Sequence, residues 1–161
     1  MTILLFSDPQ VSSVPILDDG EPLMRLIPAL SPTQALVRRS LAELLMAADL
    51  ALPAGIRLKV VEGYRSVADQ RAIIETYSAE ICAERPGLSP EELATLTSRF
   101  VAPLDVAPHV AGAAVDLTLV DATGEELDVG TPIDATPEQS DGRCYFAADG
   151  IGADARAHRD W

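Results

Sequence analysis

The pattern of apolar and polar positions predicts regular structure only after an irregular N-terminal segment. Residues 1–30 show no sustained periodicity and are interrupted by four prolines, so we expect them to wrap the outside of the domain. Apolar residues then recur at helical spacing over 31–52, and Ser31-Pro32 is a typical helix start. Alternation over 56–61 predicts a strand, which ends at the segment Glu62 to Arg65.

Two further helices are predicted from their N-terminal capping residues. Ser66, with Asp69 three residues on, begins a helix that runs to about Glu84. Ser89 is followed by a proline and two glutamates, and this predicts a helix that reaches about Phe100. Residues 101–108 contain two prolines and are expected to form a loop.

The C-terminal part of the chain predicts a hairpin and one more helix. Alternation over 113–119 indicates a strand, with Asp116 on the face opposite the core, and Leu127 and Val129 suggest a short returning strand. The core face of the first strand holds Val115, Leu117 and Leu119, and the other face also holds Thr118. A helix opens near Asp154. This order of elements predicts an α+β fold, with a small antiparallel sheet flanked by helices.

Composition narrows the class of protein. The 161 residues suffice for one domain, 1–161, and 12 basic against 25 acidic residues give a net charge of −13. Such a surface repels nucleic acid and anionic membranes, and it suits a small substrate that carries an amine. Two isolated cysteines form no disulfide framework. No N-terminal signal or membrane span is evident, so we expect a cytoplasmic protein.

His109 and Asp116 are the first candidates for chemistry. His109 follows a proline in a loop, and Gly112 permits a tight turn or a close backbone approach between the two residues. Imidazole nitrogen and carboxylate oxygen are both ligands for zinc. From these residues alone, a metal pair and an ordinary loop histidine beside a solvated strand aspartate both stay open.

Three motifs in order resemble a known family. Residues 109–119 read HVAGAAVDLTL and are similar to the H-x-x-G-x-A-x-D-L-T-L signature of the zinc D-alanyl-D-alanine dipeptidases, the VanX-like enzymes. Residues 62–65, EGYR, resemble the family's D-G-Y-R segment, and residues 130–134, GTPID, resemble its M-G-T-x-F-D segment. The likeness covers about residues 31–161.

The resemblance implies a fold, a cofactor and residue roles. It implies the small zinc fold of D-Ala-D-Ala peptidases and Hedgehog-like proteins, with His109 and Asp116 as two of three zinc ligands. Arg65 matches the arginine that stabilises the charge on the scissile carbonyl oxygen, and Asp134 matches the acid that holds the ammonium group of the substrate. The expected function is zinc-dependent hydrolysis of D-alanyl-D-alanine.

The sequence departs from the family pattern at its C-terminal end. The family's E-x-x-H element, which supplies the third ligand and a general base, does not occur in this sequence, and Ala107 replaces a common serine. The other histidine, His158, is expected on a helix surface. We therefore expect a C-terminally truncated domain that lacks its last helix and strand, with impaired activity. A non-catalytic remnant or binding module, a related zinc peptidase of other cell-wall peptides, and an oligomer or partner that supplies the missing segment stay open.

Overall fold

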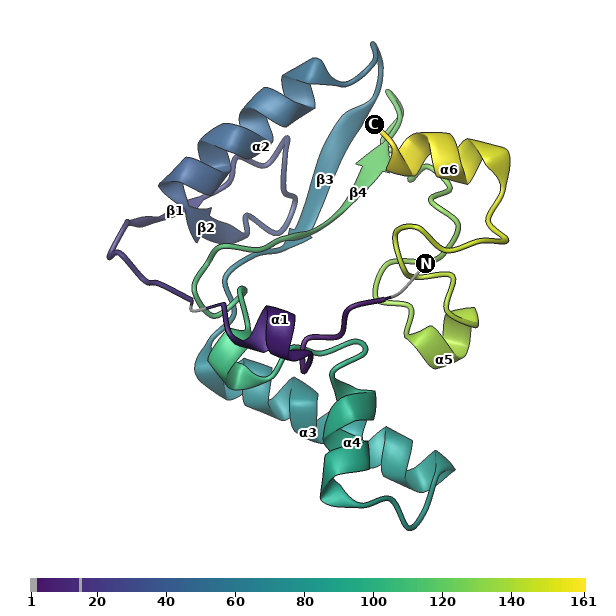
Figure 1. Cartoon of the computed structure of the whole chain (residues 1–161). Coiled ribbons are helices and arrows are strands. Elements are labelled where there is room, and N and C mark those ends of the chain that lie inside the picture. The colour runs from purple at the N-terminus through teal and green to yellow at the C-terminus, as the bar shows by residue number, and fades with distance from the viewer. Residues whose placement is uncertain (1–2, 15) are drawn as a thin grey trace. The chain divides into compact units, whose positions relative to one another are not determined.

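The computed structural model describes residues 3–14 and 16–161 and divides into two compact units (Figure 1). Unit 1 consists of Met1–Asp19 and Arg65–Ala111, and unit 2 consists of Gly20–Tyr64 and Gly112–Trp161. Each unit has its own hydrophobic core. Because both units are assembled from two separate segments, the chain passes from one to the other three times, and the prediction of a single domain stays a prediction.

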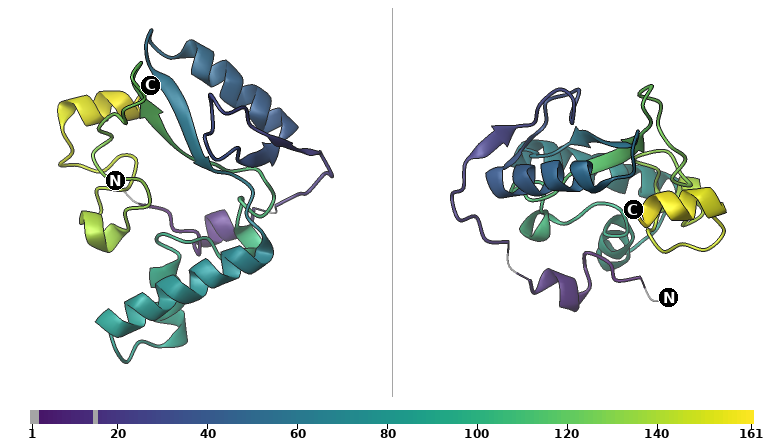
Figure 2. Two further views of the ribbon diagram at one scale, coloured as in Figure 1. Left: turned by 180° about the vertical axis from the view of Figure 1, so that it is seen from behind. Right: turned by 90° about the horizontal axis from the view of Figure 1, so that it is seen from above.

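Unit 2 contains two antiparallel strand pairs and three helices. Strands β1 (Leu23–Arg25) and β2 (Leu36–Arg38) form one pair, and β3 (Arg57–Glu62) and β4 (Asp116–Val120) form the other. Helix α2 (Arg39–Ala51) lies along the β3–β4 pair in each view (Figures 1 and 2). The buried side chains of this core come from β2, α2, β3, β4 and the segment between β1 and β2: Leu26, Leu30, Val37, Ala42, Leu45, Leu58, Val60 and Leu119.

The predicted start of α2 at Ser31 is wrong. The helix begins at Arg39, and the residues before it form β2. Ser31 is fully buried, and its hydroxyl accepts a hydrogen bond from the Ala35 N–H at 3.1 Å. Gln34 adopts a φ of 53°, which ends any helix there. The Ser-Pro signal therefore makes a tight turn, because pairing with β1 stabilises an extended conformation over 36–38.

Strand β3 lies within one residue of the prediction over 56–61, whereas β4 begins at Asp116, three residues after the predicted start, and ends at Val120. The register pairs Val60 with Leu117 and Glu62 with Asp116, with a bulge between. Leu119 lies in the core and Val115 packs against it, as predicted for this face, whereas Leu117 is 39% exposed and Thr118, expected on the other face, is only 5% exposed. Since Thr118 and Leu119 are consecutive and both buried, both faces of β4 are covered at that point.

The C-terminal part of unit 2 carries two short helices. The predicted returning strand is reduced to an isolated bridge, Val120 to Glu126, followed by a hydrogen bond from the Leu127 N–H to the Leu119 carbonyl. Helix α5 spans Pro137–Ser140 and helix α6 spans Ala153–Arg159. The helix expected near Asp154 is thus confirmed.

Unit 1 is helical. It contains α1 (Pro9–Ser12), α3 (Val67–Glu84), α4 (Pro90–Thr97) and the 3-10 helix η1 (Leu104–Val106). The cap signals at Ser66 and Ser89 are confirmed, and Ser89 forms a reciprocal capping box with Glu92. Helices α3 and α4 pack side by side around Tyr77, Ile81 and Val101 (Figure 1).

The N-terminal segment is more ordered than the sequence predicts. Residues 1–30 contain α1 and β1, and Leu26 and Leu30 belong to the core of unit 2 rather than to its outside. Residues 1, 2 and 15 lie outside the described part. Among the described helices, none combines the length and apolar character that crossing a membrane requires. The α+β class with small antiparallel sheets is confirmed.

Candidate functional site

Arg65 and His109 lie together in unit 1, although 43 residues separate them in the sequence. The backbone N–H of Arg65 donates a hydrogen bond of 3.1 Å to the carbonyl oxygen of His109. Arg65 stands directly before Ser66, the residue that caps α3, so the beginning of this helix positions it. Both side chains are half-buried. Two residues selected from separate sequence motifs are therefore neighbours in the fold.

A buried glutamine orients the guanidinium of Arg65. Arg65 Nη1 donates to Gln70 Oε1 at 2.8 Å, and Gln70 Nε2 donates to the Ala102 carbonyl at 2.8 Å. Gln70 is 1% exposed, so it has no freedom to reorient without losing both bonds. Sequence reasoning missed Gln70. The only available signal was its position one helical turn into α3, on the face that also holds the buried Tyr77.

His109 sits in a turn that is anchored by its neighbours. The N–H of Val110 donates to the Ala107 carbonyl at 3.1 Å, and the N–H of Ala111 donates to the Pro108 carbonyl at 3.2 Å. Ala107 is 1% exposed and fixes the start of this turn in the interior. The loop expected over 101–108 is present, with η1 inside it. The imidazole is thus held by a short, hydrogen-bonded turn rather than by helix packing.

Asp116 is the first residue of β4 in unit 2. Its cross-strand neighbour is Glu62, the first residue of the EGYR motif, and both side chains are half-buried. Residues that face each other across an antiparallel pair share one side of the sheet. The register therefore brings a second carboxylate beside Asp116, which sequence reasoning took only as the end of a strand.

Gly112 shows why the signature needs glycine between His109 and Asp116. Its φ is 71°, and its carbonyl accepts a hydrogen bond of 3.0 Å from the Arg38 N–H. A Cβ atom at this position would lie 2.6 Å from Leu23 Cδ2. The predicted tight turn and the predicted close approach both occur at this residue.

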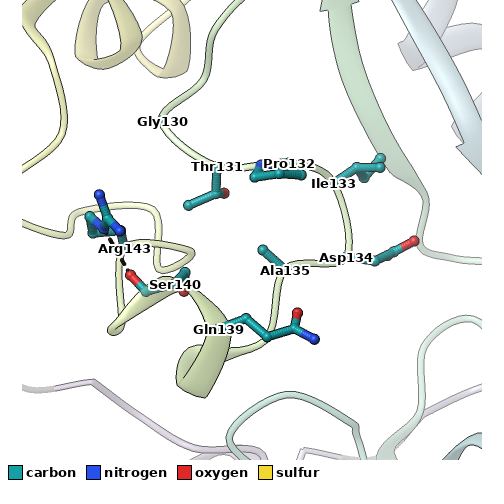
Figure 3. A pocket seen from close by; sticks show the side chains of 9 residues that line it. All are labelled: Gly130, Thr131, Pro132, Ile133, Asp134, Ala135, Gln139, Ser140 and Arg143. Atoms are coloured by element: carbon teal, nitrogen blue, oxygen red, sulfur yellow. Dashed lines mark hydrogen bonds between the residues drawn. The ribbon is translucent and has the colours of Figure 1, made fainter.

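Asp134 lies at the rim of a cavity in unit 2 (Figure 3). The cavity has a volume of about 230 Å³ and is lined by residues 130–135, Gln139, Ser140 and Arg143. Asp134 is exposed, with a φ of 59°, and its side chain points away from Arg143 (Figure 3). Within the described residues its carboxylate makes no hydrogen bond or ion pair. The φ of 59° at Asp134 is a conformation that residues with a Cβ rarely adopt.

His158 is occupied by contacts within unit 2. It lies on α6 as predicted and is half-buried, with Nδ1 2.7 Å from the Asp128 carbonyl oxygen and its ring 4.9 Å from that of Trp161. Over residues 3–14 and 16–161, no group of three or more His, Cys, Asp or Glu side chains is gathered to hold a metal ion. The predicted zinc ligands are divided between the units, with His109 in unit 1 and Asp116 in unit 2. Their donor types suit zinc, and their pairing stays a prediction.

Comparison with solved structures shows that the fold is similar to that of VanYB. The chain is similar to VanYB in complex with D-alanine-D-alanine, with a TM-score of 0.50 and 23% identity over 72% of this chain and 59% of that one. It is also similar to the D,D-pentapeptidase VanY E175A mutant from a VanB-type resistance cassette in complex with Zn(II). There the TM-score is 0.48 and the identity 23%, over 66% of this chain and 57% of that one. The chain therefore spans less than three fifths of each matched structure.

The family follows from the sequence profile. Residues 33–141 match the VanY family of D-alanyl-D-alanine carboxypeptidases, so the chain belongs to that family. A search of curated protein sequences found no significant match. The expected membership of a D-Ala-D-Ala peptidase family is thereby confirmed, with carboxypeptidases as the family shown. The narrower prediction of a VanX-like dipeptidase stays a prediction.

Proposed function

We propose that this chain forms the substrate-binding and part of the metal-binding machinery of a zinc-dependent peptidase that acts on D-alanyl-D-alanine. The observation that supports it most is the hydrogen bond between the Arg65 N–H and the His109 carbonyl. It joins the residue proposed to stabilise an oxyanion to the residue proposed to bind zinc. Membership of the VanY family and the D-Ala-D-Ala ligand of the VanYB structure support the same substrate class.

Each proposed role follows from the chemistry of its side chain. His109 and Asp116 would hold zinc, which polarises a carbonyl and activates water when bound. Arg65 carries a permanent charge and would donate hydrogen bonds to the carbonyl oxygen as negative charge develops on it. Gln70 holds one nitrogen of that guanidinium at 2.8 Å, which lowers the cost of ordering it. Glu62 is the cross-strand neighbour of Asp116, so a second carboxylate, a group that can bind a cation, stands at the same point of the sheet.

Asp134 favours the free dipeptide over longer peptides. Its exposed carboxylate would pair with the ammonium group of D-Ala-D-Ala, a group that a longer peptide does not carry at that position. The net charge of −13 also favours a substrate with a positive end. We therefore propose the dipeptide as the preferred ligand, and a terminal D-Ala-D-Ala on a longer peptide as the weaker one.

Zinc binding and ligand preference test the proposal together. Equilibrium dialysis with metal analysis is run on the wild type, on His109→Ala and on His158→Ala, the matched control at the other histidine. His109→Ala is expected to weaken zinc binding by at least about tenfold, while His158→Ala leaves it unchanged. Equal zinc binding by the wild type and His109→Ala would contradict the proposed ligand.

Calorimetry and an amine-release assay then separate an enzyme from a binding module. The zinc-loaded chain is titrated with D-Ala-D-Ala, with L-Ala-L-Ala and with an N-acylated peptide that ends in D-Ala-D-Ala. Preference for D-Ala-D-Ala with release of free alanine supports the peptidase. The same preference without release supports a binding module on this fold. Absence of any preference among the three ligands would refute both.

A further inference from the structure

The guanidinium of Arg159 joins two segments of unit 2 that are distant in the sequence. Its Nε donates to the Val129 carbonyl at 2.6 Å. Its Nη1 donates to the carbonyls of Tyr145 at 2.7 Å and Phe146 at 3.1 Å, and its Nη2 donates to the Arg143 carbonyl at 2.8 Å. All three guanidinium nitrogens are therefore used, and every acceptor is a backbone oxygen.

These acceptors are the two ends of one loop. The loop comprises residues 129–146 and includes the GTPID motif and α5. The guanidinium of Arg159 binds its first residue, Val129, and also binds residues 143–146 at its other end. The stretch in between lines the cavity of about 230 Å³ and carries Asp134 at its rim (Figure 3). One side chain, that of Arg159, thus contacts both ends of the loop that carries Asp134, the residue proposed to bind the ammonium group.

Packing at Gly130 reinforces this closure. The φ of Gly130 is 89°, and a Cβ atom there would lie 2.8 Å from Ile151 Cγ2 and 3.3 Å from Arg159 Nη2. The first residue of the GTPID motif is therefore fitted against the guanidinium itself. Burial lowers the pKa of Arg159, and the nearby charge of Arg156 lowers it further, but an arginine stays charged throughout the physiological range.

We propose that Arg159 is a positioning residue for Asp134: by holding both ends of the loop 129–146, it fixes the place from which Asp134 binds the substrate's ammonium group. The inference rests on the proposed function through the role of Asp134. The planar fork of arginine suits this task, because it can bind several carbonyls at once with little loss of side-chain entropy. Without Arg159, only separate side chains of α6 contact the two sides of the loop, His158 at the Asp128 carbonyl and Arg156 at the Phe146 carbonyl, and the loop samples more conformations.

Arg156 provides a matched control on the same helix. Its Nη1 and Nη2 donate to the carbonyls of Phe146 and Ala148, at 2.7 and 2.6 Å. It therefore binds only the far end of the loop and does not reach Val129. Arg156→Ala removes one arginine and two hydrogen bonds but leaves the loop closed, whereas Arg159→Ala opens it.

Hydrogen exchange tests the closure without any ligand. Amide exchange is followed in the wild type, Arg159→Ala, Arg159→Lys and Arg156→Ala, with β3 as the internal reference. We expect faster exchange over residues 130–142 in both Arg159 variants and wild-type exchange there in Arg156→Ala, with β3 unchanged in all. If Arg159→Ala does not fold, Arg159→Lys decides, since lysine keeps the charge but cannot bind both ends of the loop. Unchanged exchange over 130–142 in a folded Arg159 variant would overturn the inference.

Ligand discrimination tests the link to Asp134. The ratio of Kd values for N-acetyl-D-Ala-D-Ala and D-Ala-D-Ala reports recognition of the free ammonium group. We expect this ratio to fall by about tenfold in Arg159→Ala, in Arg159→Lys and in Asp134→Asn, and to stay at the wild-type value in Arg156→Ala. An Arg159→Ala ratio equal to that of the wild type, beside a reduced Asp134→Asn ratio, refutes the positioning role. A wild type that binds both ligands equally refutes the proposed role of Asp134 instead, and the exchange experiment still decides the closure.

Discussion

Replacing Gly112 by alanine adds a single Cβ atom at the centre of the His109–Asp116 signature. Two separate costs arise from the added Cβ. The backbone has a φ of 71°, a conformation that residues with a Cβ seldom adopt, and the new atom would lie 2.6 Å from Leu23 Cδ2. Because the Arg38 N–H is bonded to the Gly112 carbonyl at 3.0 Å, the backbone has little freedom to move away.

The two costs have different sizes. A non-glycine residue in the left-handed region costs about 1–2 kcal/mol. Overpacking typically costs about 1–3 kcal/mol, and the lower part of that range applies because Leu23 is only half-buried and its side-chain end can shift. Together they predict a loss of about 2–4 kcal/mol in the free energy of unfolding. That is a large share of the stability of an average domain.

Urea denaturation of the wild type and four variants separates the two costs. Gly124→Ala is the matched control, because its φ of 88° imposes the backbone cost while nothing lies within 4 Å of the added atom. Leu23→Ala and the double variant Leu23→Ala/Gly112→Ala complete a double-mutant cycle. In the Leu23→Ala background the cost of Gly112→Ala should fall to that of Gly124→Ala. A cost that is the same in both backgrounds, or a Gly112→Ala variant as stable as Gly124→Ala, would refute the assignment of the overlap to Leu23.

The remaining predictions concern stability away from the site. Asp49 is 8% exposed and accepts hydrogen bonds from Arg57 Nε at 2.8 Å and from the Leu58 N–H at 2.8 Å. Asp49→Ala should therefore lower the free energy of unfolding, measured by urea denaturation, by about 2–3 kcal/mol, and Asp49→Asn should lower it less. Burial raises the pKa of Asp49, but the bonds from Arg57 and Leu58 outweigh it and hold that pKa below its ordinary value. The part of the advantage over Asp49→Ala that depends on the ionised carboxylate should therefore be present above about pH 4 and be lost as the pH falls through the lowered pKa; an advantage that is the same in acid as at neutral pH contradicts this. Ser89→Ala removes the cap of α4 and should cost about 1 kcal/mol, whereas Ser89→Asp should retain most of the stability, as measured by thermal unfolding.

Local chemistry explains which elements were predictable. Helices α3 and α4 each begin at a serine whose side chain accepts a hydrogen bond from the backbone N–H three residues later. This signal depends only on neighbouring residues. Strand β3 was predicted because apolar and polar residues alternate from Ile56 to Val60. The same kind of cap signal failed at Ser31, where pairing between β1 and β2 used the serine in a turn instead. A local signal is reliable only where no strand partner competes for the backbone.

The candidate site likewise contains residues that the sequence could predict and residues that it could not. The identities of the former could be predicted from three short motifs, because glycine, histidine, aspartate and arginine at fixed spacing imply a particular backbone and chemistry. The residues that hold these motifs in place, Gln70 and Arg159, could not be predicted. They act through hydrogen bonds to the carbonyls of Ala102 and Val129, which lie about 30 residues away in the sequence. No spacing rule connects such partners.

The sequence by itself determined the class of this protein: an acidic α+β chain with the motifs of a D-Ala-D-Ala peptidase, at positions where a tight turn and a strand carry His109 and Asp116. Only the tertiary structure decided which residues hold those motifs in place. It paired Arg65 with the backbone of His109, set Glu62 opposite Asp116, and closed the loop of Asp134 with Arg159. The physical reason is the distance along the sequence over which each kind of interaction acts. Caps, turns and alternation depend on neighbours within a few residues, whereas strand register and side-chain-to-carbonyl bonds form only when distant segments meet.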